Sequence, residues 1–210
     1  MSIVVGLKHH QRVYIASDSQ ITVGDYKKPL RSVKSLKIWH PNEMPNIVLG
    51  SVGLVRERNV LQASSDLINH QTCAQVWSFD VHHVVNHIIP EMFELFEKHK
   101  ILPESKGMRK FNNQYLLAVD DQLFEIGYNG SVIEIDSFTA IGSGDVEAMA
   151  YLSGTTIEDP IETLAKAIQA AKMQNLYVDD PIKMTSTIST KVWEYKKEEN
   201  SASSKSTETQ

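Results

Sequence analysis

A serine directly follows the initiator methionine in the opening MSIVVGL. A small second residue permits removal of Met1, and Ser2 would then carry a free α-amine beside its own hydroxyl. The pKa of such an amine is about 7.7–8.0, so it can accept a proton near neutral pH. One residue would thus supply both a nucleophile and its base. Many ordinary, solvated termini also begin Met-Ser, so the pair alone does not decide between the two interpretations.

Three histidines form a second group of residues that could take part in chemistry. His82, His83 and His87 fall in one predicted helix, and His83 and His87 with Asp80 or Glu91 nearby could frame a divalent metal. The helix lacks the glutamate of a zinc-protease motif. A polar helix face or a subunit contact explains the histidines equally simply, so we expect no metal, and nothing in the sequence indicates a cofactor.

The composition favours a single globular domain. The chain has 210 residues, 41% hydrophobic and 22% charged. Cys73 is the only cysteine and has no matched basic partner nearby, so we interpret it as structural and expect a reducing, cytoplasmic location. A net charge of −5 with scattered Lys and Arg argues against nucleic acid, and no apolar stretch is long enough to span a membrane.

The elements that must position Ser2 begin with strands. Residues 3–7 and 12–16 are apolar, β-branched runs separated by polar KHHQ, which predicts a hairpin at the N-terminus. A second strand pair is expected at 33–38 and 47–53. Residues 115–142 are typical of a meander of four strands, with Asn129-Gly130 as a hairpin turn.

Helical periodicity separates these groups of strands. It predicts helices over 54–70 and 81–99, the second kinked at Pro90, then over 145–153 and from Pro160 to about 175. A last strand is expected near 182–194. Strand and helix runs that segregate in this way indicate helices packed outside two antiparallel sheets. We expect one domain over residues 1–195, and a disordered polar tail over 196–210 because that stretch has no aliphatic side chain longer than alanine.

Several motifs together resemble the proteasome β subunits and the bacterial proteasome-like peptidase HslV. SIVVGLKHHQRVYIASDSQIT resembles the family's opening, in which a Thr-initiated strand leads to a second strand that ends before an acid. RSVKSLKIW resembles the strand of the catalytic lysine, IVLGSVGLVRERNVL the strand-to-helix turn, and AIGSGDVEAMA the Gly-Ser-Gly segment. The resemblance covers almost the whole chain up to the tail.

The resemblance implies a role for each matching residue. Ser2 falls on the nucleophile, Asp18 on the invariant acid, and Lys34, 16 residues after Asp18, on the lysine. A buried ammonium would stabilise the alkoxide, and Asp18 would keep that ammonium charged. Gly50 would donate its N–H to the oxyanion, although a tight turn also explains a glycine there. Ser143 would help to hold the terminal amine.

The sequence also departs from the family pattern. Most relatives use threonine as the nucleophile, and Ser2 lacks the methyl group that stiffens the rotamer. The residues that contact the amine in core proteasomes are replaced by Asn175 and Val178. We therefore leave open whether Asp179 or Asp180 substitutes for them.

The resemblance implies an α+β fold, a four-layer αββα sandwich of the N-terminal-nucleophile (Ntn) hydrolase type. It further implies a self-compartmentalising endopeptidase of the threonine-protease class that acts on peptides or unfolded proteins, assembles as a homo-oligomeric ring, and has an AAA+ ATPase as a candidate partner. Two alternatives stay open: an amidase or peptide ligase with the same centre, and an inactive structural ring subunit.

Overall fold

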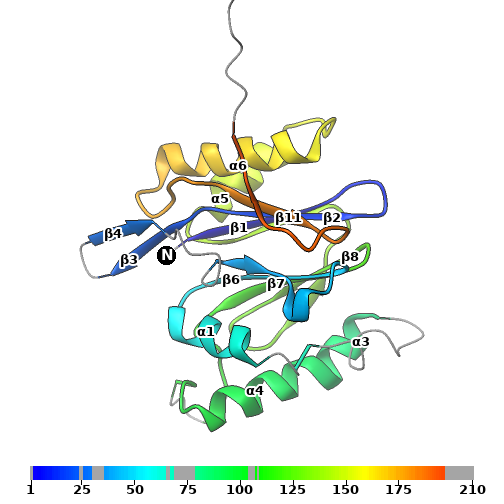
Figure 1. Ribbon diagram of the computed structural model, residues 1–210, viewed down its shortest axis with the longest axis vertical. Coiled ribbons are helices and arrows are strands. Elements are labelled where there is room, and N and C mark those ends of the chain that lie inside the picture. The colour runs from blue at the N-terminus through cyan, green and yellow to red at the C-terminus, as the bar shows by residue number, and fades with distance from the viewer. Residues whose placement is uncertain are drawn as a thin grey trace, which may run out of the picture.

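Two five-stranded antiparallel sheets face each other in the computed structural model (Figure 1). Helices cover the outer face of each sheet, so the chain has a mixed α/β architecture. The structure describes residues 2–23, 26–29, 36–64, 67–68, 79–103, 107 and 109–196. Lys34, Cys73 and residues 197–210 of the expected tail lie outside these ranges.

The first sheet contains the N-terminal strand in its interior. Its strand order is β10-β1-β2-β11-β12, so β1 is paired on both sides. The predicted N-terminal hairpin is confirmed, because β1 and β2 are antiparallel neighbours with Val4 opposite Ser17. The strands are β1 (Ile3–Lys8), β2 (Val13–Ser17), β10 (Phe138–Gly142), β11 (Lys183–Ser186) and β12 (Trp193–Glu194).

The second sheet has the order β5-β6-β7-β8-β9. The expected meander over 115–142 is only partly realised in it, because its first three strands pair in sequence whereas β10 crosses to the first sheet and pairs with β1. That crossover places Gly142 opposite Ile3. The strands are β5 (Ile38–Trp39), β6 (Ile47–Val52), β7 (Gln114–Val119), β8 (Gln122–Ile126) and β9 (Val132–Glu134).

The helices divide between the two outer faces. Helices α5 (Asp145–Ser153) and α6 (Pro160–Gln174) cover the first sheet, with the bounds that the periodicity predicts. Asp159 caps α6 by accepting from the N–H groups of Ile161 and Glu162. Helix α1 (Val55–Ala63) on the other sheet is shorter than expected. A short 3₁₀ turn, η2 (Pro41–Glu43), precedes β6.

The second predicted helix is continuous but changes its pitch. It consists of α3 (Val81–His83), the π-helical turn η3 (Val84–Ile88) and α4 (Ile89–Lys98). The N–H of Ile89 bonds to the carbonyl of Val84, five residues earlier. The irregularity expected at Pro90 is therefore a π-helical turn just before the proline.

Three apolar clusters fill the spaces between these elements. Alternation along β1 sends Ile3 and Val5 towards α5 and α6, and Val4 into the cluster between the two sheets. Helix α4 has a strongly apolar face, and its Phe93 and Phe96 pack on Phe111 beneath the second sheet. Strand β1 is consequently buried on both faces.

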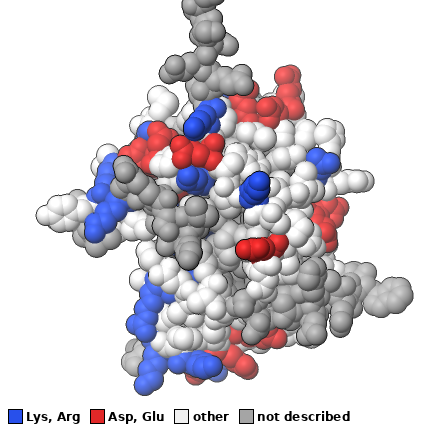
Figure 2. All heavy atoms as spheres, viewed as in Figure 1, with Lys and Arg blue, Asp and Glu red and all other residues white. Residues whose placement is uncertain are grey.

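A separate ribbon of two strands projects beside the N-terminus (Figure 1). It pairs β3 (Gln20–Val23) with β4 (Tyr26–Pro29), and Tyr26 near its tip is 75% exposed. On the face drawn in Figure 2, basic and acidic side chains lie in several separate groups. None of the helices in the described part of the chain has the length and apolar character needed to cross a bilayer.

Helix α1 is attached to the second sheet mainly by one buried carboxylate. Glu57 is fully buried and accepts from the N–H and the side-chain amide of Asn112, each at 2.9 Å, from the N–H of Asn113 at 3.2 Å, and from the hydroxyl of Tyr115. Asn113 in turn donates to the hydroxyl of Ser51. Burial and the neighbouring Glu57 carboxylate raise the pKa of Tyr115.

We expect Glu57→Leu to lower the free energy of unfolding by about 3 kcal/mol, because several buried donors lose their acceptor. Urea denaturation followed by circular dichroism measures this loss. Glu162→Ala is the control, because Glu162 forms an exposed ion pair with Lys166, and such a pair contributes little to stability. Equal losses in the two variants would contradict this account of α1.

Candidate active site

The carboxylate of Asp18 is the centre of the candidate site. Its side chain is completely buried at the end of β2. Oδ1 accepts from the N–H of Ile3 at 2.9 Å, and Oδ2 accepts from the N–H of Gln20 at 3.0 Å. Asp18 therefore binds the backbone immediately after Ser2, which fixes the first peptide unit of β1 against the end of β2.

Lys37 is the charged partner of Asp18. Its Nζ lies 2.6 Å from Oδ1, and its side chain is 1% exposed. Burial lowers the pKa of Lys37 to about 8, although Asp18 opposes that shift by favouring the ammonium. The site therefore holds an ammonium that can lose its proton in a mildly alkaline solution.

Backbone pairing connects Lys37 to the predicted oxyanion strand. The carbonyl of Lys37 accepts from the N–H of Ser51 at 2.8 Å, and Ile38 of β5 is opposite Gly50 of β6. A Cβ on Gly50 would lie 2.7 Å from Cγ1 of Val4, closer than real Cβ contacts come. Glycine is therefore needed here for close packing against β1.

Ser2 is held from the other side by the turn after β10. Its carbonyl accepts from the N–H of Ser143 at 2.9 Å and from the hydroxyl of Ser143 at 3.3 Å. Gly142 has a φ of +106°, and a Cβ on it would lie 2.2 Å from the carbonyl oxygen of Ser2. The turn approaches Ser2 closely because Gly142 has no side chain.

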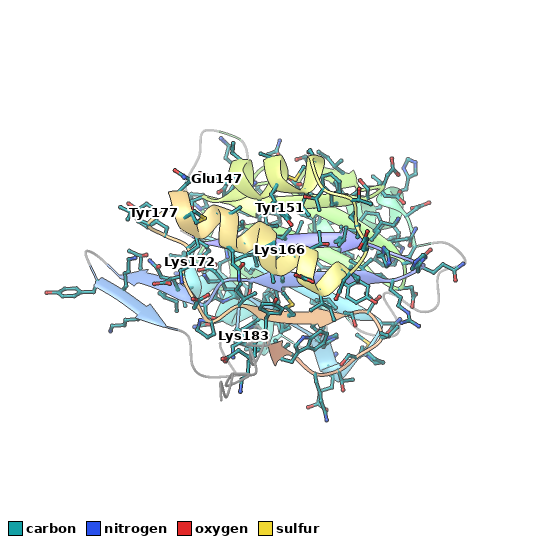
Figure 3. All side chains as sticks on the ribbon, turned by 90° about the horizontal axis from the view of Figure 1, so that it is seen from above. Glu147, Tyr151, Lys166, Lys172, Tyr177 and Lys183 are labelled. Atoms are coloured by element: carbon teal, nitrogen blue, oxygen red, sulfur yellow. The ribbon has the colours of Figure 1, made fainter. Side chains whose placement is uncertain are left out.

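The loop after α6 supports this turn through Asn175. The side-chain amide of Asn175 donates to the carbonyl of Ser143. The carboxylates of Asp179 and Asp180 instead pair with Lys172, which lies near one end of α6 (Figure 3). Only the backbone of Asp179 reaches towards Asp18, by accepting from the N–H of Ser19 at 3.1 Å.

The structure links four of the sequence-predicted residues in one network of contacts. Ser143 holds the carbonyl of Ser2, Asp18 holds the next N–H, and Gly50 packs on β1. Lys34 lies outside the described residues. The lysine found beside Asp18 is Lys37, which the sequence reasoning missed.

Alternation along the strand was the available signal for choosing between the lysines. They are three residues apart in VKSLKIW. In an extended chain such residues point to opposite faces, so only one of them can face Asp18. The register with β6 selects Lys37, and a single sequence does not reveal that register.

Two of the three helix histidines lie against each other. The rings of His83 and His87 lie 4.7 Å apart, and Asp80 caps the helix by accepting from the N–H of His83. Among the residues that the structure describes, no three His, Cys, Asp or Glu side chains are placed to hold an ion.

We expect Gly142→Ala to displace Ser2, because the new Cβ meets its carbonyl oxygen and alanine is strained at this φ. The free energy of unfolding should fall by about 2–4 kcal/mol by urea denaturation. Gly107→Ala is a matched control, because Gly107 also has a positive φ of +77° but no atom within 4 Å of the added Cβ. A loss in Gly142→Ala no larger than in Gly107→Ala would contradict the close approach.

Solved structures resemble this chain in their fold. No known family profile and no curated protein sequence match it. The structure of BPH from Thiobacillus denitrificans in complex with epoxomicin is 16% identical with a TM-score of 0.68, and the match covers 88% of this chain and 97% of that one. BPH is also matched in a second structure, at 18% identity and a TM-score of 0.64, over 88% of this chain and 96% of that one.

Eukaryotic HslV from Trypanosoma brucei is 17% identical with a TM-score of 0.60, over 88% of this chain and 98% of that one. Likenesses at these identities concern the fold. They confirm at that level the resemblance that the sequence motifs indicated. The chain has the fold that BPH and HslV share.

Proposed function

We propose that this chain is an Ntn hydrolase of the proteasome β type that cleaves peptide bonds with Ser2 after loss of Met1. The observation that carries the proposal is the buried Lys37–Asp18 ion pair, with Asp18 bonded to the N–H that follows Ser2. A buried charge pair is costly to retain for stability alone. Its contact with the residue after a hydroxyl terminus favours a catalytic role.

The proposed reaction begins with Ser2 as both nucleophile and base. The α-amine accepts the hydroxyl proton while Oγ attacks the carbonyl carbon of the substrate amide. The N–H of Gly50 donates to the oxyanion of the tetrahedral intermediate. The ammonium then returns the proton to the leaving amine, which leaves an ester on Ser2 that water hydrolyses to free the hydroxyl.

Lys37 and Asp18 assist this reaction electrostatically. The Lys37 ammonium stabilises negative charge on Oγ during attack, and Asp18 orients that ammonium. Ser143 positions Ser2 from the opposite side by donating to its carbonyl, and Asn175 supports Ser143 by donating to the carbonyl of Ser143. We therefore assign to Lys37 the role that the sequence resemblance gave to Lys34.

The fold also supports proposals about the architecture, the substrates and the assembly of this protein. The succession of helices, sheet, sheet and helices in Figure 1 supports an αββα sandwich of the Ntn type. The likeness to HslV and to BPH bound to epoxomicin supports peptides or unfolded proteins as substrates. It also supports a closed homo-oligomeric ring, with an AAA+ ATPase as a partner to be tested.

Substituting each lysine in turn tests whether Lys37, found beside Asp18, or Lys34, matched by sequence, is the catalytic lysine. We expect Lys37→Ala to lower kcat on a fluorogenic peptide by about 100-fold or more, because the alkoxide loses its cation. Lys34→Ala should retain activity within about threefold of the unaltered protein. Folding of both variants is checked by circular dichroism. Loss of activity in Lys34→Ala with Lys37→Ala active would restore Lys34 as the catalytic lysine.

The terminus gives the decisive test of the mechanism. We expect the purified protein to lack Met1, and a folded version with one extra residue before Ser2 to be inactive, because an amide nitrogen cannot accept a proton near neutral pH. Ser2→Ala should be inactive, whereas Ser2→Thr should remain active. Intact mass shows whether Met1 is present. In the same sample, reaction with a peptide epoxyketone tests for the reactive terminus, because this inhibitor bonds to both the terminal amine and the hydroxyl. Full activity with Met1 attached rules out this mechanism.

A further inference from the structure

Arg58 on α1 is a buried cation to which the proposed mechanism gives no role. It is only 2% exposed, and its buried Nε and Nη2 have no hydrogen-bond partner among the residues that the structure describes. Burying an arginine that lacks partners for these donors is costly. A compensating interaction must therefore come from a nearby charge.

Helix α1, which carries Arg58, packs against the segment that carries Lys37. Helix α1 starts just after β6, which carries Gly50. Gln62, one turn after Arg58 and on the same face of α1, donates to the carbonyl of Leu36 at 2.9 Å. This face of α1 thus packs on the segment that carries Lys37.

Asp18 is a buried anion that pairs directly with Lys37 and also acts electrostatically on Arg58. Its oxygens already accept from Ile3, Gln20 and Lys37, so Arg58 interacts with it through space. Asp18 favours the charged form of Arg58, whose pKa burial lowers. Among the described residues, the charges that act on Lys37 are Asp18 at the end of β2 and Arg58 on α1.

We propose that Arg58 is a positioning residue of the active site. Its buried guanidinium repels the Lys37 ammonium, which Asp18 attracts, and thereby sets the pH above which activity is lost. The guanidinium stays charged at every pH at which the protein works. Its repulsion weakens the hold of Lys37 on its proton, in the same direction as burial. The ammonium form of Lys37 is therefore lost at a lower pH than it would be beside Asp18 alone.

The consequence for catalysis rests on the proposed function. If the ammonium of Lys37 is the active form, removing the charge at position 58 extends activity to higher pH. The acidic limb belongs to a different group, the Ser2 amine acting as base, so the alkaline limb is the one that reports on Lys37. A purely structural arginine would lower activity at every pH without moving the alkaline limb.

The direct test follows Lys37 by NMR in the full chain labelled with ¹³Cε-lysine. The resonance of Lys37 is identified by its loss in Lys37→Met, and its titration midpoint is compared in the unaltered protein, Arg58→Met, Arg58→Gln and Arg58→Lys. We expect a higher midpoint in the two neutral variants and a nearly unchanged one in Arg58→Lys. Arg56→Met is the matched control, because Arg56 on the same helix is exposed and bonds to the carbonyl of His99; its midpoint should not move.

Turnover of a fluorogenic peptide provides the second readout. We expect the ratio of kcat at pH 9 to kcat at pH 7.5 to rise about twofold or more in a folded neutral variant. An unmoved or lowered Lys37 midpoint overturns the proposal, as does an equal shift in Arg56→Met. Failure of both neutral variants to fold, with Arg58→Lys folded, assigns Arg58 to the core alone and overturns it as well. The NMR arm needs no peptidase activity, so failure of the proposed function is distinguishable from failure of this inference.

Discussion

The carboxylate of Asp18 is the interaction on which the rest of the site depends. It has no contact with solvent, so each of its oxygens must be satisfied from within the protein. The partners come from three places in the sequence: Ile3 at the start of β1, Gln20 just after Asp18, and Lys37 before β5. One buried anion thereby fixes the terminus, the start of the β3–β4 ribbon and the lysine segment relative to one another.

Two glycines allow other parts of the chain to pack closely on the N-terminal residues. Gly50 brings the second sheet against Val4, and Gly142 brings the turn after β10 against Ser2. The two contacts come from different sheets, so the site forms only when both sheets are assembled. Glu57 and Asn113 anchor the turn that follows Gly50 and so tie strand β6 to helix α1.

Local patterns in the sequence predicted most of the elements. The N-terminal hairpin, α5 and α6 follow from apolar alternation, helical periodicity and the Asp159-Pro160 start, which are properties of neighbouring residues. The crossing of β10 to the first sheet depends on which strands meet after folding, and no local pattern encodes that pairing. Lys37 was missed for the same reason, because its place beside Asp18 follows from the register of β5 with β6. Arg58 looks like any exposed helical arginine in VRERN until burial is known.

Chain ends usually fray, because a terminal residue has few neighbours and much entropy to gain. Strand β1 is different, since its first residue, Ile3, is already paired with β10, and from Val4 onwards the strand is paired with β10 on one side and β2 on the other. Under the proposed mechanism, a reactive Ser2 directly before this strand would share the rigidity of the sheet interior, so little orientational entropy would remain to be lost when a substrate binds. The same placement makes local opening of the terminus nearly as rare as opening of the sheet itself, and hydrogen exchange of the β1 amides should therefore follow global unfolding.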